Sequence, residues 1–559
     1  MNLIQRGVAV VSLAILLTGS LVAQQIPSLG ESIEVAIVNL DVVVTDNDGK
    51  RVRGLTRADF EVLENGKPQP ISNFAEYRGS AVQTAATAAE GSTAVSTAEA
   101  PPEQRRTMVV FIEDFKLPNF RVDPFIASIK TLVRSTIRGG DAVTLVTFDG
   151  RASTIRVPST DDVSVVEAEL DQLAKEYVGP VRDRIAGAAF LARERRAFEA
   201  GGAAAAAGKG VARAAPPDSN LVAADMARSY AYEARLEMNR RVAAINSLIN
   251  GMAGIEGRKL LLLATHRLGE YTGAEYYFAA GVQDNQIPPQ ERDELDNKRA
   301  VRGIIANANA SGVTVYPVFP TGLDYTPADP GIPDVSRPVL MNEMAMLTEL
   351  AQKTGGLTTY GTAETAKLLP QVAEDVSDYY SLAYRATTDR KDRARDVVVR
   401  TKNRAYKVRS RNQFVEKSDN ARMEDRVMAV LHDVRTPMLF RISAELGEGK
   451  KTSRKTWTRP LKVRVPIKDL TMIPQDGRHQ GAFSVYIITG GRLGDVSEVT
   501  RKTQPFDIAE KDVQRAMGSY FTFDFDVLVN EGTRQVAVGV LDEVSKTYGL
   551  AAIPISTEK

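Results

Sequence analysis

The segment GGDAVTLVTFDG, residues 139–150, sets the architecture expected for this chain. A short continuous apolar run bounded by turn signals is typical of a strand that is buried on both faces of a sheet. Runs of the same kind are TMVVFIEDF at 107–115, KLLLLATH at 259–266 and VTVYPVFP at 313–320. Helical spacing separates them, as in VDPFIASIKTLVRSTI at 122–137. Strands alternating with helices predict an α/β domain with a doubly wound, mostly parallel sheet.

Strand patterns of a different kind lie on either side of this central domain, which we place at residues 107–414. The segment IEVAIVNLDVVVTDNDGKRV, residues 33–52, alternates apolar and polar positions before an Asp-Gly turn, as a half-buried strand does. We therefore expect a small N-terminal β-sandwich-like module at 31–78. Repeated alternating strands with turn signals predict a second β-sandwich-like domain at 441–559, joined through a charged helical linker at 415–440.

Three segments lack the composition of a packed core. Residues 1–23 carry Arg6 before an apolar run that is too short to span a bilayer, and this pattern indicates a cleaved signal peptide. Residues 79–106 are rich in Ala, Thr and Ser with a Pro-Pro pair, which predicts a disordered linker. An Ala/Gly-rich insertion at 196–222 interrupts the central domain in the same way. We expect an exported protein, periplasmic or extracellular, with no transmembrane segment in the mature chain.

The composition of the 559 residues disfavours several classes of function. With 71 Lys and Arg against 70 Asp and Glu, the net charge of +1 gives no electrostatic basis for binding nucleic acid. The absence of Cys excludes disulfides, thiolate nucleophiles and Cys-ligated metal sites. The three His residues are His266, His432 and His479, so that a His-based metal site or catalytic triad is not expected.

Several of these motifs together resemble a known family. GGDAVTLVTFDG, GRKLLLLA, SGVTVYPV and LAQKTGG follow one another in the order seen in von Willebrand factor A domains. VVVTDNDGKRVRGLTRADFEVLENGKPQPISNF near the N-terminus and YYSLAYRATTDRKDRARDVVVRTKNRAYKVRSRNQF at 379–414 resemble the acidobacterial VWFA-related family of exported proteins. The resemblance covers residues 33–414. It implies the α/β sheet already inferred and a role in protein binding, since such domains are commonly adhesion or complex-assembly modules.

The resemblance also implies a place for a metal ion, and here the sequence departs from the family. A metal-ion-dependent adhesion site would need an Asp-x-Ser-x-Ser motif after the first strand, which in this chain ends FIEDFKLPNF. Counting from Asp114 places Lys116 and Pro118 where hydroxyls are needed, and counting from Glu113 also gives no hydroxyl. The acid expected after a later strand is missing from residues 259–269. We therefore expect a degenerate site with no metal ion and no cofactor.

Ligands of a doubly wound sheet usually bind beyond the carboxyl ends of its strands, and we call this edge, with the loops that follow it, the rim. The residues predicted to lie at the rim are Asp114, Lys116, Asp149, Thr265 and His266. We expect them to contribute to a binding face. The alternative for each is structural, because charged loop residues are usually only solvated and a single histidine at a strand end is usually only hydrogen-bonded.

These features favour an exported, non-enzymatic binding or scaffold protein whose partner is a protein or a cell-envelope polymer. No catalytic residues are predicted. A cell-envelope hydrolase using the carboxylates of Asp114 and Asp149 is the enzymatic alternative, but no acid, base and nucleophile stand at a recognisable spacing. A metal-dependent adhesin is a third possibility, which the missing hydroxyls disfavour.

Export gives a direct prediction. The mature chain should begin at Gln24, because small and polar residues follow the apolar run up to Ala23. N-terminal sequencing of the protein from the envelope or culture fraction checks this. Cytoplasmic protein with Met1 intact would refute the prediction.

Overall fold

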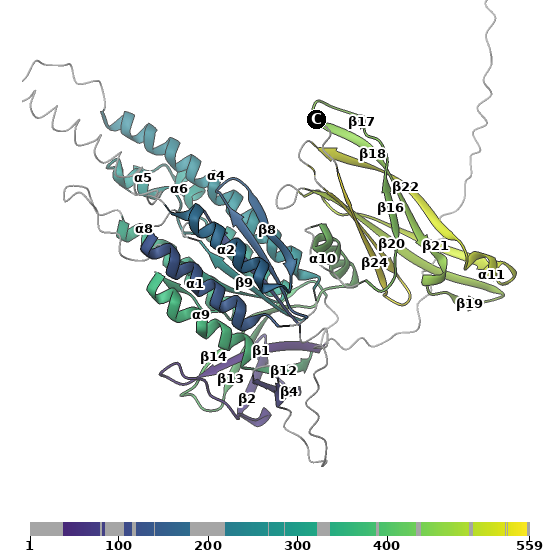
Figure 1. The fold of residues 1–559 in the computed structure, drawn as a ribbon, viewed down its shortest axis with the longest axis horizontal. Helices are drawn as coiled ribbons and strands as arrows, with labels where there is room; N and C mark the ends of the chain where they lie inside the picture. Colours follow the sequence, from purple (N-terminus) through teal and green to yellow (C-terminus); the bar gives the residue numbers. More distant parts are fainter. Residues whose placement is uncertain are drawn as a thin grey trace, which may run out of the picture.

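The computed structural model describes residues 37–78, 81–83, 105–114, 119–138, 140–178, 219–255, 257–265, 268–283, 286–320, 336–360, 362–386, 391–431, 438–490, 496–530, 533 and 535–555. The predicted signal peptide, most of the predicted linker at 79–106 and most of the insertion at 196–222 lie outside these residues. The described residues form an α/β domain, a small β module at one end of it and a β-sandwich beside it (Figure 1).

A six-stranded sheet forms the centre of the α/β domain. Its strands are β6 (Arg106–Glu113), β7 (Ala142–Phe148), β8 (Ser153–Thr160), β9 (Arg258–Ala264), β10 (Val313–Phe319) and β11 (Thr359–Tyr360). They lie in the order β11-β10-β9-β6-β7-β8, so the first of them in sequence is central and the chain winds outward in both directions. All neighbours are parallel except the edge strand β8, which runs antiparallel to β7. The predicted α/β class and mostly parallel sheet are therefore present.

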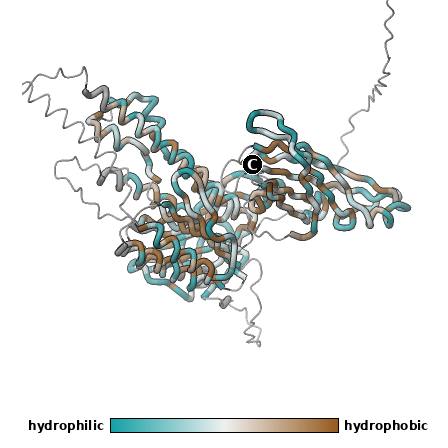
Figure 2. The backbone as a smooth tube through the Cα atoms, turned by 45° about the horizontal axis from the view of Figure 1, so that its top comes forward, coloured by the Kyte–Doolittle hydropathy of each residue, from teal (hydrophilic) through white to brown (hydrophobic). Residues whose placement is uncertain are grey.

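Helices cover both faces of this sheet. Val110 and Ile112 of β6 face one side, while Val109 and Phe111 face the other, as alternation along a strand requires. The first side packs against α1 (Asn119–Thr136), α2 (Val163–Tyr177) and α9 (Thr362–Ser377). The second packs against α4 (Ser219–Ala253), α7 (Lys298–Ser311) and α8 (Ser336–Thr354). Hydrophobic segments accordingly run through the interior of the domain in Figure 2, which explains why the strands are continuous apolar runs.

The β module is built from two segments that are far apart in the sequence. Its strands are β1 (Ile37–Thr45), β2 (Phe60–Glu64), β3 (Lys67–Gln69), β4 (Ile71–Arg78), β5 (Ala81–Gln83), β12 (Tyr379–Arg385), β13 (Ala394–Thr401), β14 (Lys407–Arg409) and β15 (Gln413–Val415). They form two sheets, ordered β14-β1-β12-β4-β5 and β15-β13-β2-β3.

This arrangement differs from the predicted boundaries, which placed residues 379–414 in the central domain. β1 lies between β12 and β14, and Leu40 of β1 shares one core with Leu382 of β12. A segment as short as 31–78 buries too little apolar surface to be stable alone, so the strands after α9 complete its core.

One buried carboxylate joins the β module to the α/β domain. Asp375, near the end of α9, is fully buried. Its two oxygens accept hydrogen bonds from Arg409 of β14 at 2.7 and 2.8 Å, and one of them also pairs with Arg51. Arg258 donates to the backbone carbonyl of Asp375 at 2.7 Å. Because Arg258 begins β9, this junction lies at the amino ends of the parallel strands, and the rim lies at the opposite end of the domain.

Two antiparallel sheets form the C-terminal sandwich around one apolar core. One sheet contains β16 (Ser443–Leu446), β17 (Lys450–Lys451), β18 (Thr456–Pro466) and β22 (Tyr520–Asn530). The other contains β19 (Ile473–Gln475), β20 (Arg478–Gly490), β21 (Thr500–Ala509), β23 (Gln535–Asp542) and β24 (Tyr548–Pro554). The short helix α11 (Val513–Ala516) lies between β21 and β22 in sequence.

Helix α10 (Asp419–Leu431) falls within the predicted linker at 415–440 and packs on the outer face of the second sheet. Met423 and Val427 cover Gly539, where a Cβ would approach their side chains to 2.3 and 2.5 Å. At the end of α4, a Cβ on Gly254 would lie 2.7 Å from the Cα of Arg426. The helix therefore connects the sandwich closely to the α/β domain.

Removing the carboxylate of Asp375 should destabilise the chain. Burial, and then the charge of Arg409, lower the pKa of Arg51 to about 10, so Arg51 is still charged at neutral pH. In Asp375→Asn, buried guanidinium groups lose their counter-charge, which should cost about 3–5 kcal/mol of unfolding free energy. Denaturant unfolding at pH 7 measures the loss. Asp171 serves as the control, because its side chain is 60% exposed and pairs with Lys130 at the surface. Asp171→Asn should lower the unfolding free energy by less than about 1 kcal/mol. Equal losses would contradict the prediction.

Candidate functional site

The carboxyl ends of the central strands bring polar residues to the rim. Glu113 at the end of β6 is in register with Phe148 at the end of β7, and the N–H of Asp114 donates to the carbonyl of Phe148 at 2.7 Å. The carboxylates of Asp114 and Asp149 therefore follow adjacent strand ends. Thr265 follows β9, on the other side of β6. The strand order reverses at β6, and ligands of doubly wound sheets bind at such a point.

A buried ion pair lies at the base of the rim. Glu113 is 2% exposed and Arg241 of α4 is 1% exposed. The Nε of Arg241 donates to Oε1 of Glu113 at 2.8 Å, and its Nη2 pairs with the same oxygen. The hydroxyl of Thr265 donates to Oε2 of Glu113 at 2.7 Å. A guanidinium and a hydroxyl thus bind both oxygens of the carboxylate.

One aromatic ring packs against this ion pair. The guanidinium of Arg241 lies 5.7 Å from the centre of the Phe148 ring, where a cation–π attraction adds to the ion pair. Tyr177, at the end of α2, is buried in the core on the other face of the sheet. Burial, followed by the negative charge of Asp114, raises the pKa of Tyr177 well above its usual value. Tyr177 therefore stays neutral across the physiological pH range.

Two of the residues predicted from the sequence are exposed at the rim. The side chains of Asp114 and Asp149 are both accessible to solvent. Oδ1 of Asp149 accepts hydrogen bonds from the N–H groups of Arg151 and Ala152 at 2.8 and 2.7 Å, which shapes the turn between β7 and β8. The pair therefore presents negative charge on a fixed backbone.

Thr265 requires a correction. It was expected to contribute to a binding face, but its exposed fraction is 0%, because its hydroxyl points inward to Glu113. Thr265 directly follows β9, but its buried side chain does not form part of the exposed surface. Lys116 and His266 lie outside the described residues.

The donor atoms that the structure describes at the rim do not form a site for a divalent cation. In the described ranges, no group of three or more His, Asp or Glu side chains could hold a metal ion. Hard cations take about six or more oxygen ligands. Here the buried carboxylate at the end of β6, Glu113, is matched by Arg241, and a metal beside this guanidinium would meet a like charge. The positive charge at this position belongs to the protein itself.

Two short helices, α5 (Ala274–Ala279) and α6 (Pro289–Leu295), pack against the first half of α4 and extend the α/β domain beyond β9. We call these helices, with that half of α4, the arm. Four aromatic side chains of the arm and of the loop before it are exposed: Tyr230 by 37%, Tyr232 by 53%, Tyr271 by 36% and Phe278 by 41%. Aromatic residues are enriched in protein interfaces, so the arm adds candidate contact surface near the rim.

From the sequence, Glu113 was predicted only as one possible first residue of an Asp-x-Ser-x-Ser motif, and Arg241 was not predicted at all. A signal for Arg241 was present. It lies three residues after Met238 and four before Ile245, which is the spacing of the core-facing side of α4. A charged residue at a core position is rarely buried without a partner, so this spacing indicates an ion pair.

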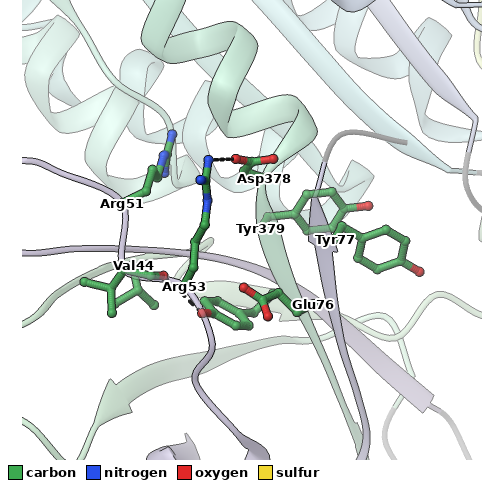
Figure 3. Close-up of a pocket in the computed structure, with 9 residues that line it drawn as sticks. Val44, Arg51, Arg53, Glu76, Tyr77, Asp378 and Tyr379 are labelled. Carbon is green, nitrogen blue, oxygen red and sulfur yellow. Dashed lines mark hydrogen bonds and ion pairs between the residues drawn. The ribbon is translucent and has the colours of Figure 1, made fainter. Parts of the chain in front are cut away.

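A hollow between the β module and the end of α9 is lined by residues that join these two parts of the chain. They are Val44, Arg51, Val52, Arg53, Glu76, Tyr77, Asp378, Tyr379 and Tyr380. Figure 3 shows Arg53 reaching Asp378 and the ring of Tyr77 beside that of Tyr379. The two rings stack with their centres 4.7 Å apart. These residues connect the two parts of the chain to each other.

Comparison with known proteins leaves the family open. No family model matches the chain, and no curated protein matches it. One similar solved structure is an aerotolerance-related membrane protein from Bacteroides fragilis, with 12% identity over 48% of this chain and 98% of that one, at a TM-score of 0.22. A second is proximal thread matrix protein 1 of mussel byssus, with 13% identity over 49% of each chain and a TM-score of 0.22. A third is the pilus adhesin SpaC of Lactobacillus rhamnosus GG, with 7% identity over 89% of this chain and 56% of that one, at a TM-score of 0.25. This chain spans about half the length of the last two. TM-scores this low carry no argument about function.

Among the helices of the described residues, none has both the length and the apolar character that a bilayer crossing requires.

A double-mutant cycle tests the buried ion pair. Glu113→Gln and Arg241→Met should each cost about 3–5 kcal/mol of unfolding free energy, because each leaves one buried partner uncompensated. The double variant should be more stable than the sum of these losses predicts, with a coupling energy above about 2 kcal/mol. The partly exposed pair of Arg156 and Glu169 serves as control and should couple by less than about 1 kcal/mol. Additive losses at Glu113 and Arg241 would show that the two side chains are not paired.

Proposed function

We propose that this chain is an exported, non-enzymatic binding protein that holds a protein partner at the rim of a degenerate von Willebrand factor A-like domain, without a metal ion. The observation that supports it most is the ion pair of Glu113 and Arg241. It supplies an internal cation at the strand end where a metal-dependent adhesion domain would hold its metal ion.

The charges at the rim indicate the kind of partner. In a metal-dependent site, the open position of the cation takes an acidic side chain from the partner. Here the cation is buried, and the first side chains beyond β6 and β7, Asp114 and Asp149, are exposed carboxylates. Complementary potentials favour association, so the partner would present Lys or Arg to this surface. Exposed aromatic side chains of the arm would add apolar contacts.

Metal removal should leave the protein unchanged. A bound cation would stabilise the folded chain by mass action, so EDTA, Ca²⁺ and Mg²⁺ should each shift the melting temperature of the mature chain by less than about 1 °C. Differential scanning calorimetry in the three buffers measures this. A rise of several degrees with either cation would support the metal-dependent adhesin instead.

Altering the exposed carboxylates should weaken partner binding without unfolding the chain. We expect Asp114→Lys combined with Asp149→Asn to reduce capture of envelope proteins by the immobilised mature chain at least about tenfold. Asp171→Lys, on the outer side of α2, should capture as the wild type does. Equal capture by all three proteins would contradict the proposal. Turnover of an envelope substrate that Asp114→Asn abolishes would favour the hydrolase.

A further inference from the structure

The C-terminal sandwich carries a second candidate interaction surface, independent of the rim. Strand β22 pairs with β18 through all 11 of its residues with no shift in register. In the described part of the chain, it pairs with no other strand, so it forms one edge of its sheet. Strand β21 forms an edge of the other sheet, where it pairs with β20. An unpaired edge exposes backbone N–H and C=O groups that another strand can bind.

The edges β21 and β22 lie on the same side of the sandwich, as their positions in Figure 1 suggest and ring contacts establish. The ring of Phe506 from β21 lies 5.0 Å from that of Phe521 from β22. Phe523 and Phe525 of β22 also face the core, yet all four rings remain partly exposed. The described strands therefore cover the core incompletely along this side.

β22 is the more accessible of the two edges for pairing. β21 contains Pro505 near its middle, which has no N–H to donate and protects an edge from further pairing. β22 contains no proline, and its outward-facing side chains include Asp524 and Asp526, both exposed. The Nζ of Lys462, on the neighbouring β18, lies 3.8 Å from Oδ1 of Asp524. The only charges on β22 are thus two carboxylates on one face.

These carboxylates distinguish between possible occupants. If two copies of β22 paired antiparallel around Phe525, Asp524 of each copy would lie opposite Asp526 of the other. Like charges directly opposite each other destabilise a strand pair, so a second copy is disfavoured. A strand with Lys or Arg at these positions is favoured for the same reason. Its alternate residues would face the partly exposed phenylalanines and should be apolar.

We propose that β22 is a docking edge for an extended segment of a partner protein, which adds to the sheet as a further strand. The segment carries Lys or Arg opposite Asp524 and Asp526, alternating with apolar residues that cover Phe521, Phe523 and Phe525. Backbone hydrogen bonds provide affinity in this mode of recognition, and the alternating side chains provide specificity.

The test uses the mature full-length chain and a capped peptide of about ten residues that alternates Val and Lys, a length that matches a strand. A second peptide has Glu in place of each Lys. Fluorescence anisotropy should show the Lys peptide binding about tenfold more tightly than the Glu peptide, since opposite and like cross-strand charges differ at two positions. Hydrogen exchange should show new protection confined to residues 520–530.

Charge variants make the test decisive. Asp524→Lys combined with Asp526→Lys should reverse the preference to the Glu peptide, and the milder Asp524→Asn combined with Asp526→Asn should abolish it. Glu445→Lys, on β16 at the far side of β18, should retain the wild-type preference. Equal binding of both peptides, a preference that survives charge reversal, or protection outside β22 would overturn the proposal. So would concentration-dependent dimerisation that protects β22 without any peptide.

Discussion

The rim depends on how the charge of Glu113 is compensated. A carboxylate buried at the central strand of a sheet needs a positive partner, because an isolated buried charge costs several kcal/mol. Arg241 supplies that charge from within the chain, and Thr265 satisfies the remaining oxygen. Within the described residues, the charge of Glu113 is thus compensated by protein groups alone. The rim also presents two carboxylates to solvent, those of Asp114 and Asp149.

Fixing Arg241 also fixes α4, a helix of 35 residues that reaches three parts of the molecule. Its first half packs against α5 and α6 in the arm, and its middle places Arg241 at the central strand. After its last turn, Gly254 lies directly against the backbone of Arg426 in α10, which covers one sheet of the sandwich. The path along α4 is visible in Figure 1. The ion pair thus connects the rim to the arm and to the sandwich through one helix.

The sequence predicted the central sheet because strands buried on both faces appear as uninterrupted apolar runs, which periodicity detects. It did not predict that residues 379–414 complete the β module, since alternation shows that a strand is half-buried but does not identify its neighbour. The rim positions of Asp114, Asp149 and Thr265 followed from strand ends alone. The burial of Thr265 did not, because it depends on Glu113 and Arg241, which lie far apart in sequence. Only the unusual core spacing of Arg241 gave a hint of that contact.

We infer that Arg241 takes the place of a metal ion at the end of β6. Crystals of the mature chain grown with Mn²⁺ would test it most directly, because anomalous scattering locates manganese independently of the protein. The account predicts no anomalous peak at the rim and the guanidinium of Arg241 bound to Glu113. An anomalous peak about 2.2 Å from an oxygen of Glu113, with Arg241 turned away, would contradict it.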